Sequence, residues 1–425
     1  MVNRNQAPAI HSIKKLFIPP TNIYAFENGT TVCEVNLGSQ DILKIEVVHK
    51  AGRSTEYQRL VSRATASLLK EGTSNKSSAA IAEEIDFYGS SIKTASNMDF
   101  AYTTVYCLLK YADQALAMVH ELYTSPSFPE EEIEKFKKLN IQKLHDELSK
   151  NEVLTYRQLT EEIFGKNHPY GYNSTEADYM DIDRTSILQH FNDFYGTDNC
   201  YIFVSGKITD AVRRKIQNYF GQTSKLSVKK QYTPVTVSHE GRTIHLYSKN
   251  EHQSALKTGF RLFNNTHPDN AAFFVLNTIY GGYFGSRLMT SIREKSGLTY
   301  DIFSNMDQML HDGCFYVSTE AATEYIPKIF DEIYHQMDRL RQKKVKKGEL
   351  EMVKNYLTGN FMNMLDGPMN VASFAKTMVL TDKKPEDFNT FFNEIKSIDA
   401  LHILDTAQKY FIKEKMIEVI VSPEQ

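Results

Sequence analysis

The sequence predicts an α/β protein of the α+β type, in which two duplicated domains each pack helices on a mainly antiparallel sheet. Its 425 residues exceed what one hydrophobic core usually supports. Hydrophobic side chains make up 41% of the chain and charged side chains 24%, which is the balance of a globular protein. The dipeptide Ile182-Asp183 recurs 216 residues later as Ile398-Asp399, and a helix followed by a strand is expected in both places.

The first domain is expected over residues 1–220. Alternating side chains around Asn28-Gly29 predict a hairpin with a two-residue turn near 23–35. A strand follows at 43–52, and the stretch 55–70 gathers its apolar side chains on one helical face. The remaining elements are a helix at 77–88, strands near 90–96 and 100–108, helices near 112–124, 129–164 and 183–195, and a strand at 200–206.

Residues 221–243 predict a linker, because they lack a helical apolar period and contain Pro, Ser, Thr and Gly. The second domain is expected over 244–425. It opens with two strand-like segments, IHLYSK and ALKTGFRL. Its other predicted elements are helices near 268–280 and 286–295, strands near 299–306 and 312–319, helices from 325 to 411, and a last strand at 416–422.

Charge and cysteine content exclude several classes of protein. The chain has 49 basic and 52 acidic side chains, for a net charge of -3, so neither nucleic acid nor a membrane surface is expected as a partner. The four cysteines are far apart and form no C-x-x-C pair, which favours buried free thiols and a reducing compartment. Without a signal-peptide pattern or an apolar run of membrane-spanning length, we expect a cytoplasmic protein.

The most informative stretch is GGYFGSRLMTSIREKSGLTYDI, residues 281–302. Its opening glycines let the backbone turn tightly and approach another chain or a ligand. These glycines are Gly281, Gly282 and Gly285. Ser286 is expected to cap a short helix, and Gly297 is expected to stop it.

The short helix would present Arg293, and the chain would return as a strand carrying Tyr300. A guanidinium offers a fork of donors to carbonyl or carboxylate oxygens, and a phenol adds a hydroxyl and a flat apolar face. The pair is therefore a candidate peptide-binding site. On spacing alone, a solvated arginine and a half-buried tyrosine beside a structural turn remain the simpler interpretation.

With these residues in view, the sequence resembles the pitrilysin/insulinase-type zinc metallopeptidases, the inverzincins, and in particular their mitochondrial-processing-peptidase-like branch. The resemblance covers about residues 20–423. Besides 281–302 it includes KAGR (50–53), KEGTSNKSS (70–78), SPSFPEEEIEK (125–135) and NHPYGY (167–172). It implies two similar α/β domains in one chain, with Arg293 and Tyr300 in contact with bound peptide.

The chain departs from that family at the metal site. Active members carry H-x-x-E-H on the first long helix, where two histidines bind zinc and the glutamate acts as general base. Counting back from Gly72-Thr73, the histidine positions hold Arg63 and Ser67, and the glutamate position holds Ala66. A guanidinium repels zinc, a methyl group accepts no proton and a hydroxyl is a poor ligand. We therefore expect no metal and no catalytic residue in this chain.

A further glutamate ligand of the family falls on Lys143 in this sequence, and a shift by one residue would give Gln142 or Leu144. None of the three is a zinc ligand in its usual state. The chain has 13 histidines, and no two are spaced four apart. The local clusters His145-Asp146-Glu147 and Glu251-His252 are expected on solvated faces.

The resemblance, together with the erased zinc site and the intact Arg293 and Tyr300, implies a non-catalytic, substrate-binding subunit of a heterodimeric zinc metallopeptidase. A homologous partner chain would supply zinc and the general base, while Arg293 and Tyr300 would hold a short or unfolded peptide. An isolated sample could instead form a homodimer. Two other functions remain open: a structural core subunit without peptide binding, and a self-sufficient zinc peptidase with atypical ligands.

Overall fold

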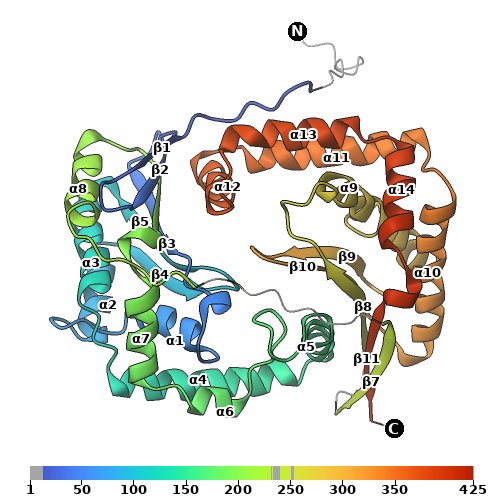
Figure 1. The fold of residues 1–425 in the computed structure, drawn as a ribbon, viewed down its shortest axis with the longest axis horizontal. Helices are drawn as coiled ribbons and strands as arrows, with labels where there is room; N and C mark the ends of the chain where they lie inside the picture. The colour runs from blue at the N-terminus through green and yellow to red at the C-terminus, as the bar shows by residue number, and fades with distance from the viewer. Residues whose placement is uncertain (1–12, 231, 233–239, 250–252, 425) are drawn as a thin grey trace.

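The computed structural model describes all residues except 1–12, 231, 233–239, 250–252 and 425, and it contains two β-sheets surrounded by helices (Figure 1). The Glu251-His252 cluster therefore lies outside the described residues, as does part of the predicted linker at 221–243. Within that linker, residues 221–230 form neither helix nor strand.

The first sheet has six strands in the order β1-β2-β6-β3-β5-β4. β2 and β6 run parallel, and the other neighbours run antiparallel. The strands are β1 (Asn22–Ala25), β2 (Thr31–Val35), β3 (Ile42–His49), β4 (Ser91–Ser96), β5 (Ala101–Leu108) and β6 (Cys200–Gly206). The predicted hairpin joins β1 to β2, but its loop spans five residues, 26–30, instead of two. Gly29 provides the φ of +93° that this loop requires.

The second sheet has five strands in the order β7-β11-β8-β10-β9. Its strands are β7 (Arg242–Ser248), β8 (Ser254–Leu262), β9 (Ile302–Gln308), β10 (Gly313–Ala321) and β11 (Ile417–Pro423). Here too one pair, β7 and β11, runs parallel and the rest antiparallel. Apart from β1, the two sheets thus share one topology, which confirms the duplicated fold that the sequence predicts.

The helices of the two halves follow the same plan. The first half contains α1 (Val61–Leu68), α2 (Ser78–Phe87), α3 (Ala112–Thr124), α4 (Glu130–Leu148), α5 (Asn151–Phe164), α6 (Glu176–Met180), α7 (Arg184–Phe194) and α8 (Asp210–Phe220). The second contains α9 (Asn270–Tyr280), the π-helix Met289–Lys295, α10 (Ile326–Gln342), α11 (Lys347–Met364), α12 (Pro368–Leu380), α13 (Phe388–Ser397) and α14 (Ala400–Tyr410). Short 3₁₀ helices lie at Arg53–Thr55, Leu109–Tyr111, Thr197–Asn199, Thr323–Tyr325, Pro385–Asp387 and Lys413–Lys415.

The repeat noticed in the sequence marks equivalent helix starts. Asp183 caps α7 and Asp399 caps α14, each by accepting a backbone N–H of the first turn, and both helices lead into a central strand. The sequence analysis did not predict α6 or α8.

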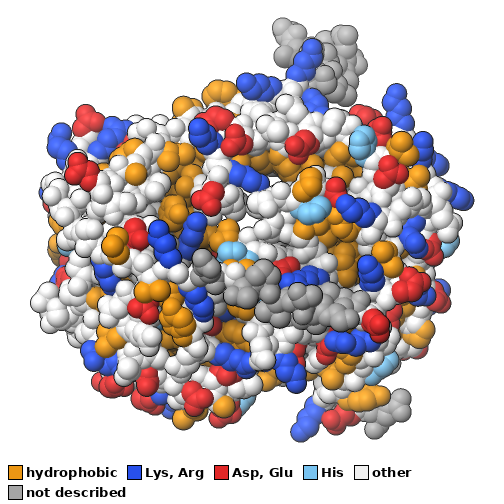
Figure 2. All heavy atoms as spheres, viewed as in Figure 1, with side chains coloured by type: hydrophobic (Ala, Val, Ile, Leu, Met, Phe, Trp, Pro, Cys, Tyr) orange, Lys and Arg blue, Asp and Glu red, His pale blue; other side chains and the backbone are white. Residues whose placement is uncertain are grey.

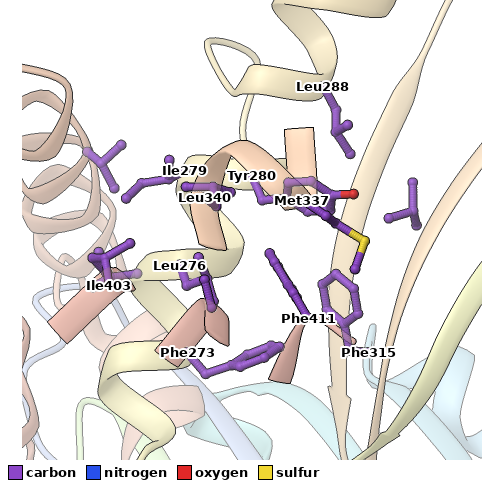
Figure 3. Packing of buried hydrophobic residues seen from close by; sticks show 14 of the residues in the cluster. Phe273, Leu276, Ile279, Tyr280, Leu288, Phe315, Met337, Leu340, Ile403 and Phe411 are labelled. Atoms are coloured by element: carbon purple, nitrogen blue, oxygen red, sulfur yellow. The ribbon is translucent and has the colours of Figure 1, made fainter. Parts of the chain in front are cut away.

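Each half has its own hydrophobic core. In the second half, α9, α10 and α14 cover β10, and aromatic side chains fill the space between them (Figure 3). Phe273, Phe315 and Phe411 meet there edge to face or tilted, with ring centroids 5.5 to 6.0 Å apart. The core of the first half lies between its sheet and the helices α1, α3, α4, α7 and α8.

The opposite face of each sheet is covered by a helix from the other half. α5, from the first half, packs on β8 and β11, and α12, from the second half, packs on β2 and β6 (Figure 1). Along β2, Val32 joins the core of its own half, while Cys33 and Val35 face α12. The two halves are therefore tied together by a reciprocal exchange of equivalent helices.

The surface and the interior agree with the composition. On the face seen in Figure 2, basic and acidic side chains are interspersed. All four cysteines are buried and unpaired, as predicted. No helix among the described residues combines the length and the apolar character needed to cross a bilayer.

Candidate functional site

The helix that would carry a zinc motif is present and holds a guanidinium. Arg63, on α1, donates a hydrogen bond of 3.0 Å from Nη2 to Oδ1 of Asn140 on α4. Its Cζ lies 5.9 Å from the ring centroid of Tyr179. Burial raises the pKa of Tyr179, and the nearby Arg63 acts in the opposite direction. Ala66 is buried one turn further on, and Ser67 is partly buried.

The face of α4 that meets α1 does not present Lys143. The buried residues of α4 are Ile133, Phe136, Asn140 and Leu144, and the side chain of Lys143 is exposed. The structure thus brings Arg63 together with Asn140 and leaves Lys143 outside. Of the positions considered from the sequence, Leu144 is buried, one turn after Asn140, and Gln142 and Lys143 are exposed.

The chain entering α1 is held by a network that the sequence analysis did not predict. The Tyr172 hydroxyl donates to the Glu56 carboxylate at 2.7 Å and accepts the Leu60 N–H at 3.2 Å. Glu56 also accepts the Ser62 hydroxyl at 2.6 Å. The Arg53 guanidinium lies over the Tyr172 ring, 3.3 Å from its centroid. These bonds hold Leu60 at a left-handed φ of +67° immediately before the helix. The NHPYGY motif therefore positions the start of α1.

The glycine-rich turn after α9 packs against its own chain. At Gly281 a Cβ would lie 2.6 Å from Ser304 Oγ on β9, and at Gly282 it would lie 2.8 Å from the Thr278 backbone. Gly285 lies against the Tyr283 ring. The close approaches that require these glycines are thus intramolecular, and they bring the turn against β9.

The π-helix after this turn carries Arg293 close to two aromatic rings. Its Cζ lies 4.8 Å from the Phe284 ring centroid and 5.4 Å from the Tyr300 ring centroid. Both rings face solvent, with Phe284 60% and Tyr300 85% exposed. Gly297, at a φ of +62°, ends the helix as predicted, and its N–H donates to the Arg293 carbonyl at 3.1 Å. In the described part of the chain, no carboxylate lies within 4.0 Å of the Arg293 guanidinium.

Phe284 is a member of this group that the sequence analysis missed. It belongs to the GGYFG turn, between Gly282 and Gly285, where no helical or strand period would bury an aromatic ring. An aromatic residue inside this glycine-rich turn was the signal by which the sequence could have indicated that Phe284 is exposed beside Arg293. Phe284, Arg293 and Tyr300 form the Arg293 group, which combines guanidinium donors with two exposed aromatic rings and suits a peptide backbone and its side chains.

The residues around α1 do not fit a zinc ion. A structural or catalytic zinc site requires three or four ligands from histidine, cysteine or carboxylate. Arg63, Ala66, Ser67 and Asn140 supply none of these. Over the residues that the structure describes, no group of three or more such side chains is arranged to hold a metal ion.

Known proteins share this arrangement of helix, sheet and turn. The family model for "Insulinase (Peptidase family M16)" matches residues 61–174, and that for "Peptidase M16 inactive domain" matches residues 181–357. The chain belongs to peptidase family M16. Within M16, it is an inactive member in the sense that the zinc ligands and the general base are absent from the helix that carries them.

Several M16 relatives align over most of the chain. "Uncharacterized zinc protease YmxG" of Bacillus subtilis is 23% identical over 93% of this chain and 97% of its own length. "Non-peptidase homolog YmxG" of Helicobacter pylori is 24% identical over 75% of both chains. "Mitochondrial-processing peptidase subunit beta" of Caenorhabditis elegans is 20% identical over 97% of this chain and 92% of its own.

Solved structures share the two-domain M16 fold. A protease from Helicobacter pylori superposes with a TM-score of 0.87 at 17% identity, covering 96% of this chain and all of that one. A protein from Pseudomonas fluorescens, described as a peptidase M16 inactive domain, superposes with a TM-score of 0.84 at 20% identity, covering 95% and 98%. At these identities the likeness establishes the fold.

Proposed function

We propose that this M16 chain is the non-catalytic, substrate-binding subunit of a heterodimeric zinc metallopeptidase. The observation that carries the proposal is the half-buried Arg293, whose guanidinium lies 4.8 Å from the ring centroid of the exposed Phe284 and 5.4 Å from that of the exposed Tyr300. A guanidinium in contact with two aromatic rings is restricted in orientation before a ligand arrives, so less conformational entropy is lost on binding.

The zinc and the general base would come from a homologous partner chain. Arg63, Ala66 and Ser67 remove both functions from α1 of this chain, while the fold around that helix is kept. A chain that keeps a peptide-binding surface without its own metal site is suited to pairing with one that has the metal. The likeness to a processing-peptidase subunit supports a paired arrangement.

In this proposal the chain positions the substrate and performs no bond cleavage. Arg293 donates to carbonyl oxygens of an extended peptide, and Tyr300 adds a hydroxyl and a ring face. Holding a peptide in one orientation near a reacting centre supplies a large part of a rate acceleration. Short or unfolded peptides are the expected substrates, because they can adopt the extended conformation.

The test is a set of variants assayed with the partner. The partner would be identified by co-purification as a chain of similar length that retains H-x-x-E-H. We expect Arg293→Ala to lower kcat/KM of the complex by about tenfold or more, because a charge-assisted hydrogen bond is lost. Tyr300→Phe should lower it less. Lys328→Ala on α10 is the control, since Lys328 is exposed and lies outside the Arg293 group.

Two results would replace the proposal with one of the other functions. Unchanged turnover in both variants, together with no peptide binding by the complex, would leave a structural subunit. One equivalent of zinc in the purified chain, with peptidase activity of its own, would identify a self-sufficient enzyme.

A further inference from the structure

A basic groove of about 370 Å³ borders the π-helix on which Arg293 lies. It runs between that helix, the end of α10 and the start of α11. Six cationic side chains line it: Arg287, Lys295, Arg339, Lys343, Lys344 and Lys346. Glu349 is the one acidic side chain among the described residues that line it. In a chain with a net charge of -3, this is a local excess of positive charge.

The single carboxylate does not neutralise the groove. Glu349 accepts two hydrogen bonds from Arg287, at 2.7 and 2.9 Å, so its charge is already matched by one guanidinium. Within the described ranges, no acidic side chain lies within 4.0 Å of Lys295, Lys343 or Lys344, and the same holds for Lys346 and Arg339. Five cations therefore have no ion-pair partner among the residues that the structure describes.

The loop that carries three of these lysines is anchored. Val345, between Lys344 and Lys346, is 4% exposed and belongs to the core of the second half. The lysines on either side of it are exposed. Since burial of Val345 fixes the loop backbone, Lys343, Lys344 and Lys346 are attached at one end of the groove, where their like charges repel one another. An anionic ligand would relieve that repulsion.

The groove shares the π-helix and the preceding turn with Arg293. Gly285, which follows Phe284 directly, lines the groove, and so does Lys295, two residues after Arg293. The hydroxyl-bearing Ser286, Thr290 and Ser291 lie along the same wall. The wall is thus rich in donors and suits a row of carboxylates.

We infer that the groove binds an acidic segment of the peptide substrate, so that substrates with clustered aspartates or glutamates are preferred. The inference rests on the proposed function in that this chain binds a peptide substrate. The groove itself requires only charge complementarity, which acts in the isolated full-length chain.

The test uses two fluorescent peptides of one sequence, which carry either a run of glutamates or the same run of glutamines. Binding to the full-length chain is measured by fluorescence anisotropy at low and at physiological salt. We expect the glutamate peptide to bind more tightly and its advantage to shrink as salt screens the groove. The variant Lys343→Gln/Lys344→Gln/Lys346→Gln should weaken binding of the glutamate peptide by about tenfold or more, because three exposed charges are removed from the groove.

The matched control is Lys93→Gln/Lys138→Gln/Lys150→Gln, which removes three exposed charges outside the groove and so has the same net charge. Equal binding of the two peptides, or equal loss in both triple variants, would overturn the inference. Tighter binding of a single-stranded oligonucleotide than of the glutamate peptide would also overturn it. Suppose that Arg293→Ala leaves the affinities for the glutamate and the glutamine peptide unchanged, but that the groove triple variant still weakens binding of the glutamate peptide. The groove is then supported and the proposed function fails.

Discussion

At the position of the first zinc-binding histidine, Arg63 donates to Asn140, and this contact decides which residues of α4 face the degenerate site. Sequence counting gave Lys143, with Gln142 and Leu144 one residue away. It could not choose among them, because neighbouring residues on a helix point about 100° apart and a one-residue shift changes the face. The packing makes the choice, since Leu144 is 3% exposed.

A zinc site rebuilt on this scaffold tests that assignment. We expect Arg63→His/Ala66→Glu/Ser67→His combined with Leu144→Glu to bind zinc, because two imidazoles four residues apart then face a carboxylate on α4. With Lys143→Glu as the fourth change, zinc affinity should be about tenfold weaker or more, because that carboxylate points to solvent. Isothermal titration with zinc measures the difference, after circular dichroism confirms that both variants are folded. Equal affinities would show that α4 does not present Leu144 to the site.

At the scale of elements, local patterns predicted most helices and strands, while contacts between the halves set features that no local pattern contains. The stretch 129–164 was expected to be helical, and it divides into α4 and α5 without a glycine or proline. The break is held by Asn151, which donates to the Gln253 carbonyl at 2.7 Å and accepts from the Ser248 hydroxyl at 2.5 Å. Both partners lie in the second half. An amphipathic pattern shows that a face is buried, but it does not show which sheet buries it.

Two buried histidines make the first half sensitive to acid. His49, on β3, and His190, on α7, are almost fully buried, and burial lowers the pKa of His49 to about 3 and that of His190 to about 4. Lys225 contributes to the shift at His49. Because the unfolded chain binds these protons near pH 6.5 and the folded chain does not, stability is complete above pH 6.5 and falls as the pH drops toward 4.

We expect each histidine to lower the free energy of unfolding by about 2 kcal/mol at pH 5 relative to neutral pH. His49→Phe should remove roughly half of the stability loss that the two histidines cause together at pH 5, because phenylalanine keeps an aromatic ring at this position but has no group that titrates. Urea unfolding at pH 7 and pH 5, followed by circular dichroism, measures both values. His335→Phe, at an exposed position on α10, is the control. An unchanged pH dependence in His49→Phe would contradict the expectation.

At the scale of the whole molecule, the exchanged helices place charges of opposite sign at equivalent points of the two sheets. Glu46 on β3 pairs with Phe203, and Lys257 on β8 pairs with Val419, which lies 216 residues after Phe203. Each charge meets the helix that arrives from the other half. Lys376 of α12 contacts Glu46 at 2.7 Å, and Glu152 of α5 lies 3.6 Å from Lys257. The duplication thus preserved the geometry and reversed the polarity of the contact.

The Glu46 contact is expected to be the stronger of the two. The Glu46 side chain is 4% exposed, with Lys44 at 2.7 Å as a second cation, whereas the Glu152 side chain is 58% exposed. Burial alone would raise the pKa of Glu46, but hydrogen bonds from Lys376 and Lys44 hold it below its usual value. Removing one cation leaves a buried carboxylate with incomplete compensation, which destabilises more than the loss of an exposed pair.

We therefore expect Lys376→Met to lower the free energy of unfolding by about 1–3 kcal/mol. The effect is smaller than for a fully buried pair because Lys376 is partly exposed and Lys44 still compensates the charge of Glu46. A double-mutant cycle with Glu46→Gln isolates the coupling between the two side chains. Hydrogen exchange should become faster in α12 and β2, where the halves meet, and stay unchanged in α10. Lys409→Met, which breaks an exposed ion pair with Asp269 inside the second half, should leave the protection of α12 intact. Zero coupling, or a uniform loss of protection over all helices, would show that the halves are held together by the apolar faces of α5 and α12 alone.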